Sequence, residues 1–299
     1  MKAKIFIIPA ILAVAACQQM EVDNSTPVEK PEKGSMATLT LTATKGEAHT
    51  KALDLVNDGT RLNAYWKSTE TVKVYKDGTL LGSLSVSPAD GEKPTSATLS
   101  GSINTTGLAV NDALTLMIPR DGWDYTGQTG KLTGEDSVED TYSYAMATIN
   151  VASVDNGTVV PAANAVFSNQ QSIYRLGFVD NGYLDPREVT IFATGGKLVR
   201  SVSYEGAAWT QAFGWINVVP AAAAADHFYY VSLRNDSTAA DTYSFSIIGS
   251  DFALYTAAKN IPADALDVPG KFISAKDISA TKANFAPTTT SGTTTNTAL

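Results

Sequence analysis

Apolar and polar residues alternate along most of the chain, which is the pattern of half-buried β-strands. The clearest case is segment 36–44, where Leu39, Leu41 and Ala43 fall on one face and threonines occupy the other. No stretch keeps a 3.6-residue apolar period over three turns, so long helices are not predicted. Alternation bounded by turn residues predicts further strands at 72–75, 80–86, 97–103, 114–118, 145–151, 173–179, 189–194, 228–233 and 243–248.

Turn residues separate these strands and indicate how they group. Asp77-Gly78 predicts a tight hairpin, because this pair suits the positive φ angles of a type I′ turn. Many short strands between such turns indicate β-sandwiches of roughly 100 residues each. We therefore expect an all-β fold with two sandwich domains, divided at the run Asp155 to Pro161. The predicted N-terminal domain is 36–158, the C-terminal domain is 159–285, and a polar, threonine-rich tail follows at 286–299.

The first residues predict export and a lipid anchor. Two lysines precede an apolar run at 5–16, which is shorter than the about 20 residues of a membrane-spanning helix and is typical of a signal peptide. The run ends at Cys17, the single cysteine of the chain, and this ending resembles a bacterial lipobox. We expect residues 1–16 to be the signal peptide, Cys17 to be the lipidated first residue, and 17–35 to be a tether.

Composition and motifs narrow the function classes. The chain is 44% hydrophobic and 17% charged, as in globular proteins, and its net charge of −8 argues against nucleic acid as a partner. It has two histidines, His49 and His227, and no nucleophile elbow, zinc motif, phosphate loop or dinucleotide-binding loop. The acidic cluster at 135–140 is interpreted as a solvated loop. We therefore predict no enzyme activity, no cofactor and no metal site.

An ordered set of short motifs links the chain to a known family. The set begins with the lipobox, the polar tether, the alternating strand 36–44 and Thr50-Lys51-Ala52. It continues with a Trp66 segment before Val72-Lys-Val-Tyr75, then Ile173-Tyr-Arg-Leu-Gly-Phe178, Val189-Thr-Ile-Phe-Ala-Thr-Gly-Gly196, Phe228-Tyr-Tyr-Val231, Tyr243-Ser-Phe-Ser-Ile-Ile248 and Gly270-Lys-Phe272. Together these motifs resemble the fimbrillin family of Bacteroides-type pilus lipoproteins over most of the chain.

The resemblance implies two tandem transthyretin-like β-sandwiches at the cell surface, anchored by lipid in the outer membrane and part of a fimbrium. It implies that a trypsin-like protease cuts after a basic residue and that the first strand then leaves. Lys51 best matches the cleavage position, and Lys45 is the runner-up. The displaced strand would carry Leu39, Leu41 and Ala43, and other pilus subunits would be partners by strand exchange. The polar stretch 286–299 is a poor donor strand, which argues against a polymerising stalk subunit and leaves anchor, tip and non-polymerising members open.

Aromatic residues carry the alternative function, a surface lipoprotein that binds host or bacterial glycans. Trp123 and Tyr125 lie in a polar, glycine-bearing stretch after the strand at 114–118. If both rings are exposed, they offer faces on which a sugar stacks. The competing interpretation is that they are buried amphipathic plugs at the end of a sandwich. Trp209, Phe213 and Trp215 are interpreted as core and edge packing.

Overall fold

The computed structural model describes residues 35–45, 53–55, 62–118, 122–205, 208–266 and 270–283, and strands make up most of them. The signal peptide, Cys17, most of the tether, His49, Lys51 and the tail 286–299 lie outside these residues. Two helices occur in the described part, α1 (Val138–Thr141) and α2 (Ala263–Leu266). No helix among these residues has the length and apolar character needed to cross a membrane.

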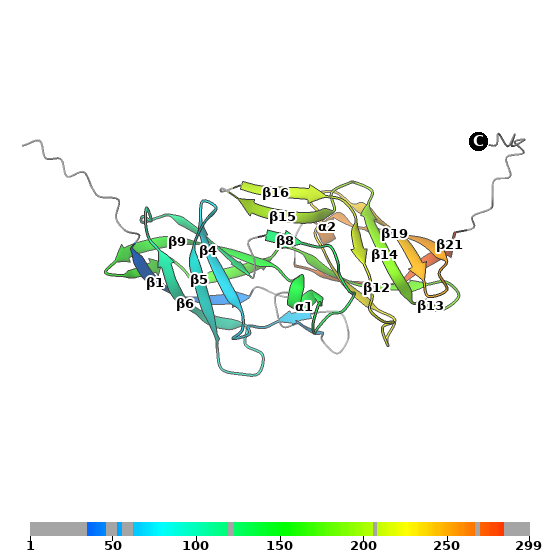
Figure 1. The fold of residues 1–299 in the computed structure, drawn as a ribbon, viewed down its shortest axis with the longest axis horizontal. Coiled ribbons are helices and arrows are strands. Elements are labelled where there is room, and N and C mark those ends of the chain that lie inside the picture. The colour runs from blue at the N-terminus through cyan, green and yellow to red at the C-terminus, as the bar shows by residue number, and fades with distance from the viewer. Residues whose placement is uncertain are drawn as a thin grey trace, which may run out of the picture. The chain divides into compact units, whose positions relative to one another are not determined.

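Seven strands of the N-terminal part close into a barrel (Figure 1). Their bounds are β1 (Met36–Lys45), β4 (Thr71–Lys76), β5 (Thr79–Pro88), β6 (Ser96–Asn104), β7 (Ala113–Ile118), β9 (Ala145–Asp155) and β11 (Ala165–Asn169). The order around the barrel is β1-β11-β9-β7-β4-β5-β6, and β6 pairs again with β1. A short strand, β10 (Thr158–Pro161), pairs with both β1 and β9. Closure leaves no edge among these seven strands, and β1 is one of the strands that completes it.

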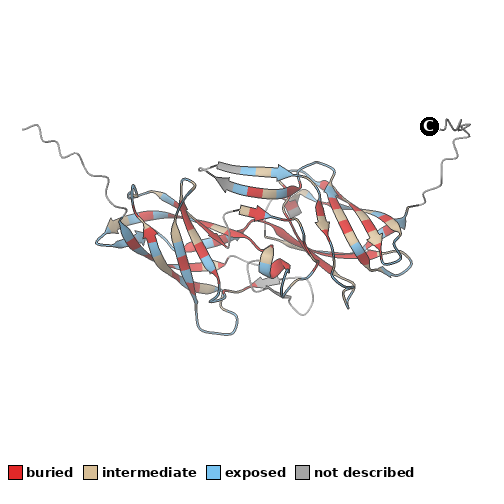
Figure 2. Ribbon diagram, viewed as in Figure 1, coloured by how far each residue is buried: buried red, intermediate tan, exposed pale blue. Residues whose placement is uncertain are grey.

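The barrel is filled by the apolar side of each alternating strand. Figure 2 shows buried residues alternating with exposed ones along these strands. The core contains fully buried aliphatic side chains from β1, β4, β5, β6 and β7, among them Leu39, Val72, Val74, Leu84, Leu99, Leu114 and Leu116. Such side chains are each worth roughly 1.5–3 kcal/mol when fully buried, so the barrel interior is the main source of stability for β1.

Two tight turns have the same backbone geometry, although the sequence predicts a hairpin at only one of them. Asp77 and Gly78 have φ angles of 46° and 77° and join β4 to β5, which confirms the predicted hairpin. Asn156 and Gly157 have φ angles of 47° and 78° and join β9 to β10 in a second hairpin. The predicted domain boundary lies at this turn, but both β10 and β11 pair within the barrel. The strands of the barrel therefore continue to Asn169, and the division into two domains stays a prediction.

The C-terminal part forms a second, open sheet. Its strands are β12 (Ser172–Val179), β13 (Tyr183–Leu184), β14 (Pro186–Ala193), β17 (Ile216–Val218), β18 (Tyr229–Leu233), β19 (Asp241–Gly249), β20 (Leu254–Ile261) and β21 (Phe272–Lys282). The order is β13-β12-β21-β20-β19-β14-β17, with β18 also paired to β12. One face packs on a second core that includes Phe178, Ile191 and Phe245.

Shorter strands complete the fold. β8 (Gly122–Asp124), β15 (Val199–Glu205) and β16 (Ala208–Phe213) form a three-stranded sheet in which β15 is central. β2 (Leu53–Leu55) pairs with β3 (Leu62–Ala64). The all-β class is confirmed, and each predicted strand has an observed counterpart. The finer prediction of two tandem transthyretin-like sandwiches is not confirmed, because the first sheet closes on itself and the second remains open.

Candidate strand-exchange site

Strand β1 is held along both of its edges. On one side it pairs antiparallel with β6 over nine residue pairs, from Met36 opposite Asn104 to Thr44 opposite Ser96. On the other side it runs parallel to β10 and then to β11. Removing β1 would therefore leave a groove between β6 and the pair β10/β11, with unused backbone donors and acceptors on both walls.

The side chains of β1 follow the predicted alternation. Leu39, Leu41 and Ala43 are 0%, 5% and 0% exposed and belong to the barrel core. Thr38, Thr40 and Thr42 face outward and are exposed. The three residues named as groove-filling from sequence thus share one buried face. This geometry permits another strand to take the place of β1 and of these three side chains.

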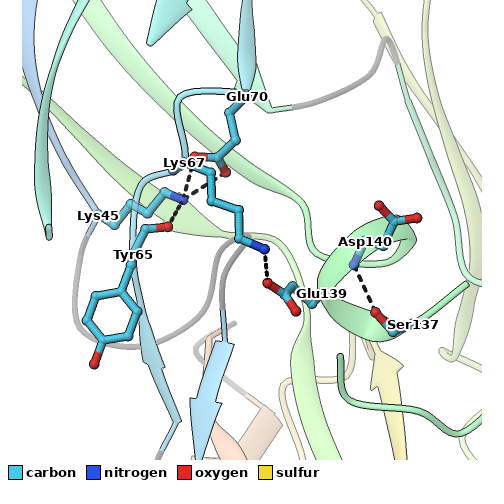
Figure 3. Close-up of polar contacts among 7 residues, drawn as sticks. All are labelled: Lys45, Tyr65, Lys67, Glu70, Ser137, Glu139 and Asp140. Carbon is cyan, nitrogen blue, oxygen red and sulfur yellow. Dashed lines mark hydrogen bonds and ion pairs between the residues drawn. The ribbon is translucent and has the colours of Figure 1, made fainter. Parts of the chain in front are cut away.

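Lys45 is the last residue of β1 and lies on its buried face. It is the charged residue on that face, whose other members are apolar. Its side chain is 1% exposed. The Nζ ammonium donates to Glu70 Oε1 at 2.8 Å, to Glu70 Oε2 at 3.0 Å and to the Tyr65 backbone carbonyl at 2.6 Å (Figure 3). The ammonium also lies 4.4 Å from the centre of the Trp66 ring, within the range of a cation–π contact. A buried charge is tolerated only with such partners.

Glu70 is positioned by the loop that leads into β4. Its side chain is also 1% exposed, and Oε2 accepts a hydrogen bond of 2.8 Å from the Lys67 backbone N–H. The Lys67 side chain points toward α1, where it forms an ion pair with Glu139. Ser137 caps α1 by accepting from the Asp140 N–H at 3.1 Å. We call Lys45, Tyr65, Trp66 and Glu70 the β1 clamp, because together they hold the end of β1.

The β1 clamp bears directly on the two candidate cleavage positions. A trypsin-like protease binds an extended chain and takes the basic side chain into a pocket. Lys45 is part of a paired strand and its ammonium is buried in the β1 clamp, so the folded chain does not offer it to a protease. Lys51 lies outside the described residues and stays a prediction.

The proposed glycan contacts at Trp123 and Tyr125 need a correction. Both rings are buried, at 3% and 0% exposure, and both pack on Tyr144 with ring centres 6.0 and 5.5 Å apart. Tyr125 Oη donates to the Gln170 carbonyl at 3.2 Å, and burial raises the pKa of its hydroxyl well above the usual value. The interpretation as buried plugs is the one that the structure supports, because no ring face remains for a sugar.

Exposed aromatic rings lie instead on the outer face of the second sheet. Phe192 and Trp215 are 42% and 54% exposed, with ring centres 6.5 Å apart. The sequence does not predict these exposed rings, because the pattern around Trp215 indicates packing. A usable signal was present: Phe192 follows Ile191, and alternation on β14 puts neighbours on opposite faces.

His227 and the acidic cluster at 135–140 are the remaining candidates. His227 Nδ1 is 2.8 Å from Asp185 Oδ1, and its ring stacks on Tyr183. These contacts connect the loop before β18 to residues 183–185. The acidic cluster is a solvated loop only in part, because Glu135 and Asp136 are exposed but Glu139 is buried in α1 and pairs with Lys67. Among the described residues, no group of three or more His, Cys, Asp or Glu side chains is arranged to hold a metal ion.

Comparisons with known proteins find similarity in solved structures. No family model and no curated protein matches the sequence. Solved structures with a low similarity to the chain include fimbrial proteins and candidate cell adhesion proteins.

Three of these structures give the scale of the likeness. A candidate cell adhesion protein of Bacteroides eggerthii is 12% identical with a TM-score of 0.39, over 85% of this chain and 98% of that one. The C-terminally truncated tip fimbrial protein Mfa3 of Porphyromonas gingivalis is 8% identical with a TM-score of 0.38, over 84% and 100%. A fimbrial assembly protein of Parabacteroides distasonis is 9% identical with a TM-score of 0.35, over 84% and 100%. Identities and TM-scores this low give no information on function.

Proposed function

We propose that the chain is a fimbrillin-like surface lipoprotein and a structural or adhesive pilus component, without catalytic activity. It is anchored in the outer membrane through a lipidated Cys17, and it assembles by strand addition after β1 is removed. The observation that carries the proposal is β1 itself. It closes the barrel between β6 and β10/β11, fills the core with alternate side chains, and is followed by a segment that contains Lys51.

Strand addition supplies the affinity and specificity that such assembly needs. Backbone hydrogen bonds along β6 and β10/β11 give affinity to any extended chain, and pockets for alternate side chains select its sequence. In the intact chain β1 has the advantage of a covalent tether, which keeps its local concentration high. Cleavage after Lys51 removes that advantage, so a strand from another subunit competes for the same groove.

Limited trypsin digestion tests the proposal. We expect a first cut after Lys51 that yields a stable body beginning near Ala52, with Lys45 spared because its side chain is buried. The cut body then forms oligomers on size-exclusion chromatography. The matched control is Lys51→Ala, which should resist the first cut and remain monomeric. A cut body that stays monomeric and keeps β1 bound contradicts strand addition.

A second candidate function, binding of neutral saccharides, is favoured by one observation on the second sheet. A groove of about 560 Å³ runs over its outer face, beside Phe192. Register places Asn217, Thr190, Ser246, Thr256 and Thr281 in one row across five strands. Next to this row stand Ser244 and Ser279, and Phe192 packs near Trp215 at one end. Uncharged hydroxyls beside exposed rings match the hydroxyls and C–H faces of a neutral sugar.

Calorimetric titration with neutral oligosaccharides of glucose, mannose and xylose tests this second candidate. We expect Trp215→Ala to weaken binding by about tenfold, since an aromatic contact is worth on the order of 1 kcal/mol. Tyr183→Ala is the matched control, because Tyr183 is 48% exposed at the opposite edge of the same sheet. Equal binding by both variants, or no binding by the unaltered chain, contradicts the saccharide site.

A further inference from the structure

The groove on the outer face of the second sheet crosses the strands instead of following one of them. Phe192 of β14 lies opposite Ser244 of β19, and Ser244 lies opposite Ala258 of β20. Ser279 of β21 lines the same groove. Beyond the Phe192 ring these side chains are small, so they form a floor with open space above it. The groove therefore runs from its aromatic end across β19, β20 and β21.

Hydroxyl groups line one side of this groove at the interval of the strands. Ser246 lies opposite Thr256, and Thr256 lies opposite Thr281, so β19, β20 and β21 each contribute one hydroxyl. Neighbouring strands lie about 4.7–4.9 Å apart, which sets the step from one of these positions to the next. Among the described residues that line the groove, none has a charged side chain. A matching ligand is therefore neutral and repeats its own hydroxyls at nearly the same interval.

An extended pyranose chain has such a repeat. In a β-linked chain of the cellulose type each ring advances by about 5 Å, close to the strand spacing, so successive rings meet successive strands. An α-linked chain of the amylose type curves into a helix, and its rings leave a straight row after a few units. The linkage thus decides whether a chain of the same sugar stays in contact with the whole groove.

We infer that the groove binds a linear, neutral, β-linked glycan with one ring over each strand. This inference rests on the saccharide-binding function proposed above. The first ring stacks on Phe192 and Trp215, whose ring centres are 6.5 Å apart. Three further rings lie over Ser244, Ala258 and Ser279. The hydroxyls beside this floor hydrogen-bond along one edge of the chain, because each serine or threonine hydroxyl both donates and accepts.

Calorimetric titration of the full chain with oligosaccharides of glucose tests the inference. Cellotetraose and maltotetraose are the matched ligands, because both are neutral chains of four glucose rings that differ only in their linkage. We expect cellotetraose to bind on the order of tenfold more tightly than maltotetraose or cellobiose, because its third and fourth rings add hydrogen bonds over β20 and β21. A fifth ring lies beyond the groove and should add less than about twofold.

An obstacle in the middle of the groove tests where the chain lies. Ala258 is exposed, so Ala258→Leu fills the groove over β20 and leaves the core unchanged. We expect this variant to bind cellotetraose no more tightly than cellobiose, with its affinity for cellobiose unchanged within about twofold. Ala152→Leu is the matched control, because it adds the same side chain at an exposed position of β9. It should leave both affinities unchanged.

The outcomes separate this inference from the function on which it rests. Equal binding of cellotetraose and maltotetraose, or of cellotetraose and cellobiose, overturns the alignment of one ring with each strand but leaves saccharide binding standing. Equal losses of cellobiose and cellotetraose affinity in Ala258→Leu overturn it as well. If no oligosaccharide of glucose, mannose or xylose binds, the saccharide function itself is wrong.

Discussion

Replacing Glu70 by alanine is expected to lower the free energy of unfolding by about 3–5 kcal/mol. The loss is large because the variant removes the carboxylate that neutralises an ammonium whose side chain is 1% exposed. A domain is stable by only about 5–15 kcal/mol in total, so this one change consumes much of the margin. Urea unfolding followed by intrinsic fluorescence gives the measurement, with the slope of the transition unchanged if both chains expose the same surface.

Two matched variants identify the cause of that loss. Lys45→Met/Glu70→Leu replaces the whole buried pair by apolar side chains and should be as stable as the unaltered chain or more so. Lys67→Ala breaks an ion pair whose lysine side chain is 46% exposed, and it should cost no more than about 1 kcal/mol. If Glu70→Ala lowers the free energy of unfolding as little as Lys67→Ala does, the β1 clamp does not stabilise the end of β1.

Local patterns in the sequence were sufficient to place ten of the 21 described strands. Alternation set the buried face of β1, and Asp77-Gly78 gave the hairpin of β4 and β5 because both signals act over a few residues. The same turn chemistry at Asn156-Gly157 was ambiguous, since a tight turn and a domain linker use the same residue types. The pairing of β10 and β11 with β1, more than a hundred residues earlier in the chain, shows that the chain continues in the barrel after this turn.

The candidate site could be predicted only in part, because local patterns do not reveal which distant residues meet in the fold. Leu39, Leu41 and Ala43 followed from alternation, and the same alternation extended by one step puts Lys45 on the buried face. Its partner Glu70 is distant in sequence, so barrel closure is needed to bring the two together. The burial of Trp123 was one of two interpretations of the sequence, because its neighbours are polar and its burial depends on the pairing of β8 with β15.

A covalent staple across β1 and β6 is expected to abolish assembly altogether. Thr42 and Thr98 are directly opposite in the antiparallel pair, and both are exposed. Opposite residues of antiparallel strands have Cα atoms about 4.5–5.5 Å apart, which suits a disulfide. In a chain carrying Cys17→Ser, the staple Thr42→Cys/Thr98→Cys therefore keeps β1 in place after cleavage. The control staple Ser85→Cys/Ser100→Cys joins β5 to β6 and leaves β1 unrestrained.

The central claim is that the departure of β1, and not the cut itself, opens the groove for another strand. Its most direct measurement is the oligomeric state of the cleaved, stapled chain before and after reduction, by size-exclusion chromatography with light scattering. We predict a monomer with the β1–β6 staple oxidised, oligomers once it is reduced, and oligomers in both states with the β5–β6 control staple. Oligomers formed while the β1–β6 staple is intact would contradict the claim, because β1 would then still fill the groove.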